Sequence, residues 1–361
     1  MRPSAEIIRS FCFLMLIGAA VASGCRDATK PSKKAVESTA AKVGTMPSDE
    51  ECRQFAGAIQ KAVKSGDGAA VDRLIDYDAI LESATGGVSC DRKIRRQFIS
   101  ENKSELRSQA GLGTMIARAL GSGGSYDFLR ISTVDGKKRV LFRMLLPNGG
   151  LNYHEWIVVK DPSGNVRSID VFIYLVGESF AQTLRPWFLD LVKQNSSSSS
   201  FFGGSGTDGD LAKHASKLPQ IAASARTGQF QRALQLYNTL PASLKKKKSL
   251  LITRLQAATG LRDNNEMAAA VRELMKHYPN DPCIALVSLD YHFLNKDYEK
   301  VIACVDKLDK AVGGDPYLKT MRAGIFRIKG DVETAARLAV EAAKEERELQ
   351  ERIQQVQNSL P

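Results

Sequence analysis

Two polar side chains near the middle of the chain are of the types that acid–base catalysis uses. His154 lies in an alternating segment expected to be a strand, on the same face as Trp156, and Asp170 lies in the next such segment. A histidine oriented by a carboxylate is a common general base. The alternative is a histidine at a strand edge and an exposed aspartate, because antiparallel sheets often expose polar residues on one face. We favour this alternative and expect no catalytic residue.

Other sequence features also argue against turnover and against a cofactor. No nucleophile-elbow, phosphate-loop or dinucleotide-binding motif stands in a strand–turn–helix setting. The six cysteines include no C-x-x-C pair, which argues against a zinc site or a redox dithiol. No two of the histidines have metal-ligand spacing on one helix face: His154, His214, His277 and His292. We therefore expect no metal and no cofactor.

Length and composition are those of a globular protein with room for two domains and linkers. The chain has 361 residues, of which 43% are hydrophobic and 25% are charged. Its formal net charge of +11 suits an anionic surface such as lipid head groups or nucleic acid. The alternative, which we favour, is a protein whose lysines are spread over its surface.

The start of the chain has the organisation of a secretory signal. Two arginines precede an apolar run over residues 11–21, and the small residues 22–24 lead to Cys25. The apolar run has about half of the ~20 residues that a membrane-spanning helix needs. This segment resembles the lipobox of bacterial lipoproteins, in which the cysteine sulfur receives a diacylglyceryl group and the new N-terminus is acylated. The resemblance implies a signal peptide over residues 1–24 and lipidation at Cys25.

Residues around Cys25 refine this interpretation. Ala22 departs from the lipobox, where leucine is commonest, so cleavage by an ordinary signal peptidase is the alternative. Arg26 stands where an inner-membrane retention signal usually has aspartate, which implies an outer-membrane anchor facing the periplasm. Residues 25–48 contain almost no large apolar side chain, so we expect a disordered tether between the membrane and the first domain. Export also removes the chain from the cytoplasm, and we expect no nucleic-acid partner.

The expected location outside the cytoplasm permits disulfides. Cys52 and Cys90 fall in one domain and are the candidate pair, and the alternative is two separate buried thiols. Cys283 and Cys304 lie at different heights along one expected helical hairpin. Because a disulfide requires Cα atoms within about 7 Å, we expect these two to be free, buried thiols.

Residues 49–193 are predicted to form an α+β domain. Helical spacing recurs around residues 52–63, 71–75 and 93–106, and a closing helix is expected over residues 178–192. Between them, period-two segments separated by glycine-rich turns predict a four-stranded antiparallel meander: residues 126–134, 139–146, 151–159 and 166–176. Helices followed by a meander resemble the cone-shaped nuclear transport factor 2 (NTF2) and SnoaL-like superfamily, which contains both enzymes and members without known activity.

A Ser- and Gly-rich stretch, residues 194–210, is predicted to be a flexible linker between domains that move independently. Beyond it, several columns of residues recur at a step of 34, among them Phe230, Asn264, Tyr298 and Val332, and the turn column of Gly228, Arg262, Lys296 and Gly330. This period predicts stacked helical hairpins and resembles the tetratricopeptide repeat (TPR). The resemblance covers about four units over residues 211–346, with residues 347–361 as a capping helix and tail.

In the TPR family, the first helix of each hairpin lines a concave groove that binds proteins. Carried over to this chain, the resemblance implies a groove lined by eight residues: Ile252, Gln256, Thr259, Leu286, Asp290, Phe293, Thr320 and Arg327. The alternative is that the repeats pack on the protein's own middle domain.

The function expected from these features is a non-catalytic, lipid-anchored scaffold of the cell envelope that binds other envelope proteins or peptides. One alternative is an envelope enzyme or small-ligand binder that uses the cone pocket of the middle domain. Another is an assembly factor whose repeats dock on an outer-membrane complex.

Overall fold

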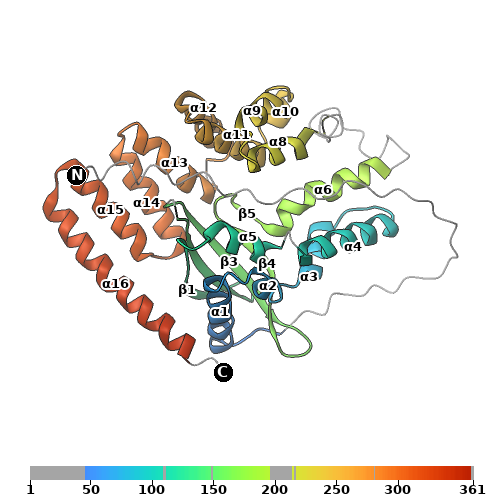
Figure 1. Cartoon of the computed structure of the whole chain (residues 1–361), viewed down its shortest axis with the longest axis horizontal. Helices are drawn as coiled ribbons and strands as arrows, with labels where there is room; N and C mark the ends of the chain where they lie inside the picture. Colours follow the sequence, from blue (N-terminus) through green and yellow to red (C-terminus); the bar gives the residue numbers. More distant parts are fainter. Residues whose placement is uncertain are drawn as a thin grey trace.

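The computed structural model describes residues 45–108, 111–147, 149–195, 214, 217–279 and 281–358. The predicted signal peptide, Cys25, most of the predicted tether and the predicted linker beyond residue 195 lie outside these ranges. Within them, an α+β part with an antiparallel sheet is followed by a helical region (Figure 1), as the sequence predicts. No helix in the described ranges is long and apolar enough to span a membrane.

Five helices precede the sheet: α1 (Asp49–Lys64), α2 (Gly68–Asp72), α3 (Tyr77–Thr85), α4 (Arg92–Ser108) and α5 (Leu112–Leu120). A capping box starts α1, because Ser48 and Glu51 each accept a hydrogen bond from the other's backbone N–H. The sequence predicted α1, α2 and α4 but not α3 and α5. Both missed helices have nine residues, which is too short to be stable without tertiary contacts.

One buried carboxylate holds α5 in place. Asp72 of α2 accepts hydrogen bonds from the backbone N–H groups of Gly113 (2.7 Å) and Thr114 (3.0 Å) and from the hydroxyl of Tyr77 (2.5 Å). The N-terminus of α5 is therefore capped from another helix. Close packing accompanies this contact, since a Cβ atom added to Gly113 would lie 2.5 Å from the Cβ of Val71.

The sheet is an antiparallel meander in the order β1-β2-β3-β4-β5. Its strands are β1 (Ser125–Val134), β2 (Lys137–Leu145), β3 (Leu151–Lys160), β4 (Val166–Ile173) and β5 (Glu178–Ser179). The two-residue β5 was not predicted. The fourth strand ends at Ile173 rather than Val176, because the chain turns at Gly177, whose φ is +63°. The closing helix α6 (Phe180–Asn195) consequently begins two residues later than predicted.

The two faces of the sheet are covered by different parts of the chain. One face, here called the α1 face, carries Tyr126, Phe142, His154 and Trp156, and the Trp156 ring contacts Phe55 of α1. The opposite face, here called the α15 face, carries a second set from the same strands: Asp127, Arg143, Tyr153, Glu155 and Asp170.

The C-terminal region is helical throughout its described part. Its helices are α8 (Lys217–Arg226), α9 (Phe230–Asn238), α10 (Ala242–Lys245), α11 (Lys248–Leu261), α12 (Asn264–His277), α13 (Pro282–Leu294), α14 (Tyr298–Val312), α15 (Pro316–Lys329) and α16 (Val332–Asn358). Four pairs, α8–α9, α11–α12, α13–α14 and α15–α16, each pack as a hairpin across a short turn. Asp281 and Asp315 cap α13 and α15, and each of these helices has a proline in its first turn, where the missing N–H is not needed.

The turn column of the 34-residue pattern has one shared conformation. Gly228, Arg262, Lys296 and Gly330 all have positive φ, between +58° and +89°. This left-handed geometry ends the first helix of each hairpin, and glycine adopts it without steric cost. Arg262 and Lys296 adopt the same geometry despite their Cβ atoms, so the hairpin turn is kept where the residue type departs from the pattern.

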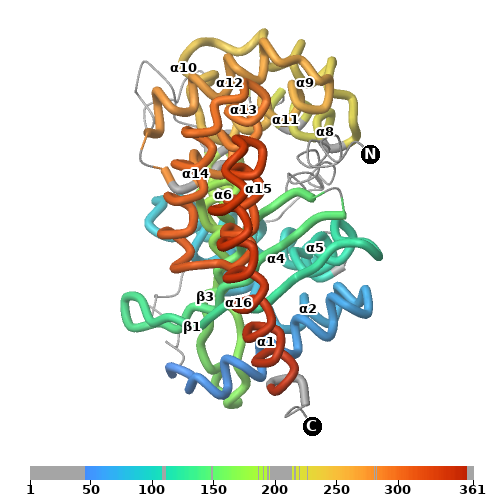
Figure 2. Tube along the Cα trace, turned by 90° about the vertical axis from the view of Figure 1, so that its left-hand side faces the viewer, coloured from blue at the N-terminus to red at the C-terminus, as the bar shows by residue number. Residues whose placement is uncertain are grey.

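The last helix corrects the predicted boundary after residue 346. The helix α16 is a single element of 27 residues that passes this position without a break. Leu349 and Ile353 in its C-terminal half are 3% and 5% exposed, and the helix packs along α1. Figure 2 shows α16 running down the side of the molecule to α1. The predicted capping segment is therefore part of the contact with the middle domain.

The middle domain and the later hairpins share one hydrophobic core. A single cluster of buried side chains includes Phe55 of α1, Trp156 of β3, Leu318 of α15 and Ile353 of α16. The first hairpin buries side chains together with α10 and α11 in two smaller clusters. The hairpins from α11 onward thus bury side chains in one core with the sheet, whereas the sequence predicted a linker between two separate domains.

Candidate functional site

His154 is sealed inside the sheet's α1 face. It is 0% exposed, its Nδ1 lies 2.9 Å from the Tyr126 hydroxyl, and its Nε2 lies 2.9 Å from Nδ2 of Asn152. The Asn152 amide is oriented by its oxygen, which accepts from the backbone N–H groups of Tyr153 and Leu175. Asn152 therefore donates to Nε2, and the imidazole carries its proton on Nδ1. Burial lowers the pKa of His154 to about 3.

Asp170 lies on the other face of the sheet and has a different task. Its carboxylate accepts hydrogen bonds from the backbone N–H groups of Val171 (2.9 Å) and Ala181 (3.1 Å), so it caps the first turn of α6. Burial raises the pKa of Asp170. In register, Asp170 pairs with Ile157, whereas His154 pairs with Ile173.

The structure therefore separates His154 from Asp170. They cannot act as a base and its orienting group, because their side chains project from opposite faces. The favoured alternative of a strand-edge histidine and an exposed aspartate also needs correction. His154 is fully buried and Asp170 is half-buried, because helices cover both faces of a sheet that the sequence suggested was solvated on one side.

The predicted groove residues do not form one accessible surface. Ile252 and Leu286 are buried in the shared core. Four further residues are half-buried: Gln256, Thr259, Asp290 and Phe293. Burial raises the pKa of Asp290 to about 7. Thr320 and Arg327 are exposed. Part of the predicted binding surface is thus used to pack the hairpins on the middle domain, which was the alternative interpretation.

The described cysteines are all free thiols. Cys52 is buried in α1 and Cys90 is half-buried between α3 and α4, so the structure has the two separate thiols rather than the Cys52–Cys90 disulfide. The reason is their placement, since α1 packs on β1, α2 and α16, whereas α3 and α4 pack on each other. Cys283 is buried and Cys304 is half-buried. No group of three or more metal-ligating side chains occurs in the described ranges.

Arg143 is the centre of a buried ion-pair cluster on the α15 face. It is 2% exposed, and its guanidinium lies 2.8 Å from Asp315, 2.8 Å from Glu346 and 3.1 Å from Asp127. Asp315 also accepts from the Tyr153 hydroxyl at 2.7 Å. The sequence did not identify this cluster, because its members come from two strands of the sheet and from the hairpins that follow.

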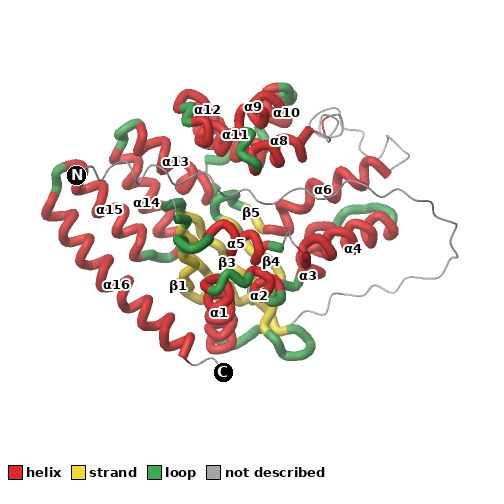
Figure 3. Tube along the Cα trace, viewed as in Figure 1, coloured by secondary structure: helices red, strands yellow, loops and turns green. Residues whose placement is uncertain are grey.

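A second feature that the sequence analysis missed lies at the hairpin turns. The last turn of α11, α13 and α15 each presents one exposed apolar side chain, namely Leu261, Leu294 and Ile328, which are 38%, 37% and 45% exposed. An exposed cation that forms no ion pair with another described residue lies within two positions of each: Arg262, Lys296 and Arg327. We call these six residues the turn edge. Figure 3 shows the turns of the last two hairpins on the same, upper left side of the molecule.

Comparison with known proteins gives no further guide to this chain. No protein family, no curated protein and no solved structure matches it.

Proposed function

We propose that this chain is a lipid-anchored protein of the bacterial cell envelope that binds another protein and carries out no turnover. The observation that carries this proposal is the turn edge. Single exposed apolar residues are common on protein surfaces, but here one recurs in the last turn of the first helix in three consecutive hairpins. Each lies near an exposed cation that forms no ion pair with another described residue.

The turn edge indicates the kind of partner. Alternating apolar and cationic side chains along a repeat array complement a segment that carries both apolar and acidic residues. The rest of the array is less available, because several predicted groove residues are buried or half-buried against neighbouring elements. We therefore place the binding surface on the turn edge rather than in the groove.

Binding without turnover is also supported by the middle domain. The histidine that the enzyme alternative needs is 0% exposed, and its two ring nitrogens are both engaged by neighbouring side chains. A general base must reach the proton that it abstracts. The order of helices followed by an antiparallel meander supports the proposal that this domain is NTF2-like, and the repeated left-handed turn supports the proposal that the hairpins are TPR-like.

Replacing the apolar part of the turn edge should abolish partner binding. The triple variant Leu261→Ser, Leu294→Ser, Ile328→Ser removes exposed side chains and should leave the fold intact. We expect crosslinks from Lys296 and Lys329 to a partner, measured by mass spectrometry of the native membrane fraction, to fall by at least about tenfold. Met275→Ser is the matched control, since Met275 is 40% exposed on α12 away from the edge. Unchanged crosslinks in the triple variant would rule out the turn edge.

Replacing the predicted lipidation site should release the protein from the membrane. We expect Cys25→Ser to move most of the chain into the soluble envelope fraction and to abolish incorporation of radiolabelled palmitate. The physical reason is that acyl chains supply the attachment, at about 0.8 kcal/mol per buried methylene group. Membrane retention of the variant would show that another part of the chain holds it there. Recovery of acylated wild-type protein in a stoichiometric outer-membrane complex would instead favour the assembly-factor role.

A further inference from the structure

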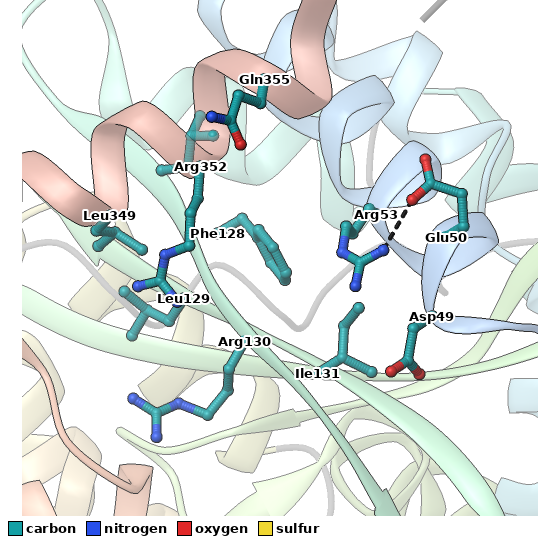
Figure 4. A pocket seen from close by; sticks show the side chains of 11 residues that line it. Asp49, Glu50, Arg53, Phe128, Leu129, Arg130, Ile131, Leu349, Arg352 and Gln355 are labelled. Carbon is teal, nitrogen blue, oxygen red and sulfur yellow. Dashed lines mark hydrogen bonds and ion pairs between the residues drawn. The ribbon is translucent and has the colours of Figure 1, made fainter. Parts of the chain in front are cut away.

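A pocket outside the features described so far lies where three distant elements meet. The N-terminal turn of α1, the middle of β1 and the C-terminal half of α16 border a half-open hollow of about 620 Å³ (Figure 4). Small-molecule sites in proteins commonly have volumes of about 300–1,000 Å³. The pocket exists only because α16 continues past the predicted repeats and packs along α1.

Three arginines line the pocket, one from each element: Arg53 of α1, Arg130 of β1 and Arg352 of α16. Figure 4 shows the side chains of Arg53 and Arg352 on facing helices beside the hollow, with Arg130 at its lower edge and its guanidinium turned away. Guanidinium groups can hold a carboxylate or a phosphate through paired N–H donors.

The two carboxylates in the pocket wall do not neutralise this charge fully. Asp49 is engaged by Lys138 at 2.6 Å, and Glu50 pairs with Arg53 at 2.7 Å. Neither Arg130 nor Arg352 forms an ion pair with any residue of the described ranges. Two cations of the wall are thus left without a carboxylate partner.

The bonds that these two arginines do make are to neutral groups. Arg130 donates to the backbone carbonyls of Gly313 and Gly314, and its buried Nε has no partner. Arg352 donates through Nε to the carbonyl of Glu348 at 3.3 Å. Burial lowers the pKa of Arg130, and the nearby charge of Arg352 acts in the same direction, against the opposing effect of Asp315 and Asp309. No carboxylate of the described ranges lies within ion-pair distance of Arg352, and an anion placed beside this guanidinium would supply that partner.

The rest of the wall is apolar. Phe128 and Ile131 of β1 form one side, and Leu349 and Ile353 of α16 form the other. Phe128, Leu349 and Ile353 belong to the shared core and are held in fixed positions by it. A ligand with a hydrocarbon or aromatic part would therefore find a rigid apolar surface beside the cations.

We propose that this pocket binds an amphiphilic organic anion. Its carboxylate or phosphate group lies between Arg352 and Arg53, and its apolar part lies against Phe128 and Ile131. This inference does not depend on the envelope location or on the turn edge, because it rests on residues of α1, β1 and α16 alone.

Titration with simple probes tests the site. Hexyl phosphate, inorganic phosphate and hexanol are added to the full-length protein to about 10 mM at a pH of about 7.5, where a phosphate monoester is mostly dianionic. Isothermal titration calorimetry is expected to rank them in that order, with no detectable heat from hexanol. Tighter binding of dihexanoyl phosphatidate than of hexyl phosphate would assign the ligand to lipids, and weaker binding would assign it to soluble metabolites.

Substitution of single arginines inside and outside the pocket makes the test specific. Arg352→Gln removes an exposed side chain, so the fold should persist, and we expect hexyl phosphate to bind about tenfold more weakly, or ~1.4 kcal/mol. Arg53→Gln, on the facing helix, is expected to weaken binding severalfold. Arg347→Gln removes an exposed arginine from α16 outside the pocket and should leave the affinity unchanged. Equal affinity in wild type and Arg352→Gln, or no binding to wild type, would overturn the proposal.

Discussion

Replacing Arg143 by methionine is expected to lower the free energy of unfolding by about 3–5 kcal/mol, the usual effect of removing one partner of a buried ion pair. The substitution leaves the carboxylate of Asp315, whose side chain is 0% exposed, without its cation. Tyr153 and the backbone N–H of Tyr317 would remain as its donors. Urea unfolding followed by circular dichroism measures the loss. Hydrogen exchange should quicken in α15 and α16 before it does in the sheet.

Two further variants separate the effect of the buried charge from other effects. Adding Asp315→Asn to the Arg143 variant should recover part of the loss, because asparagine still caps α15 but carries no charge. Arg337→Met removes an exposed pair with Glu341, in which the two side chains are 62% and 43% exposed, and should change stability by less than about 0.5 kcal/mol. A loss below about 1 kcal/mol in the Arg143 variant would mean that the ion-pair cluster does not hold the hairpins on the sheet.

Acidification is expected to destabilise the folded protein through His154. Burial lowers the pKa of this imidazole from 6.5 to about 3, so below pH 6.5 the unfolded chain binds a proton that the folded chain does not. The free energy of unfolding should then fall by about 1.4 kcal/mol for each pH unit, or about 2 kcal/mol between pH 6.5 and pH 5. Above pH 6.5 His154 is neutral in both states, and this contribution to the pH dependence disappears.

The measurement compares the pH dependence of two proteins rather than their stabilities at one pH. Burial raises the pKa of Asp170, Glu178 and Asp290, and these carboxyl groups stabilise the folded state on acidification, opposite in sign to His154. His154→Gln keeps a neutral hydrogen-bonding side chain and retains the three carboxyl groups. Between pH 6.5 and pH 5, the free energy of unfolding measured with urea should therefore fall by about 2 kcal/mol less in the variant than in the wild type. Equal losses would mean that water reaches His154 in the folded protein.

The shared core limits which side chains of the repeat array are available to a partner. The first hairpin packs with α10 and α11 in two small clusters, whereas the later hairpins bury side chains together with the sheet. Side chains that pack within the molecule are not available to a partner. The side chains of the turn edge and of Arg352 are exposed rather than packed in this core, which is why we place both proposed interactions there.

Local elements were predictable because their signals are local. The Asp135-Gly136 pair forms the β1–β2 turn with both residues at positive φ, and Asp315 caps α15 before a proline. Turn geometry and helix capping depend on neighbours within a few residues, so the types and spacing of residues suffice. Helices α3 and α5 were missed because local signals do not determine them. The cap of α5, for example, is Asp72, which lies 41 residues away in the sequence.

The partners of each sheet face were decided only by the tertiary structure. Strand alternation placed His154 on one face with Trp156, because side chains alternate strictly along a strand, but only the register of β3 with β4 separates His154 from Asp170. It could not tell that helices from the far end of the chain cover the α15 face. Arg143 pairs with Asp315, which lies 172 residues further along the chain. No local sequence pattern around either residue indicates that the two are in contact. Charged residues in a strand usually face water. Arg143 instead lies in a buried ion-pair cluster, because α15 and α16 pack against its face of the sheet.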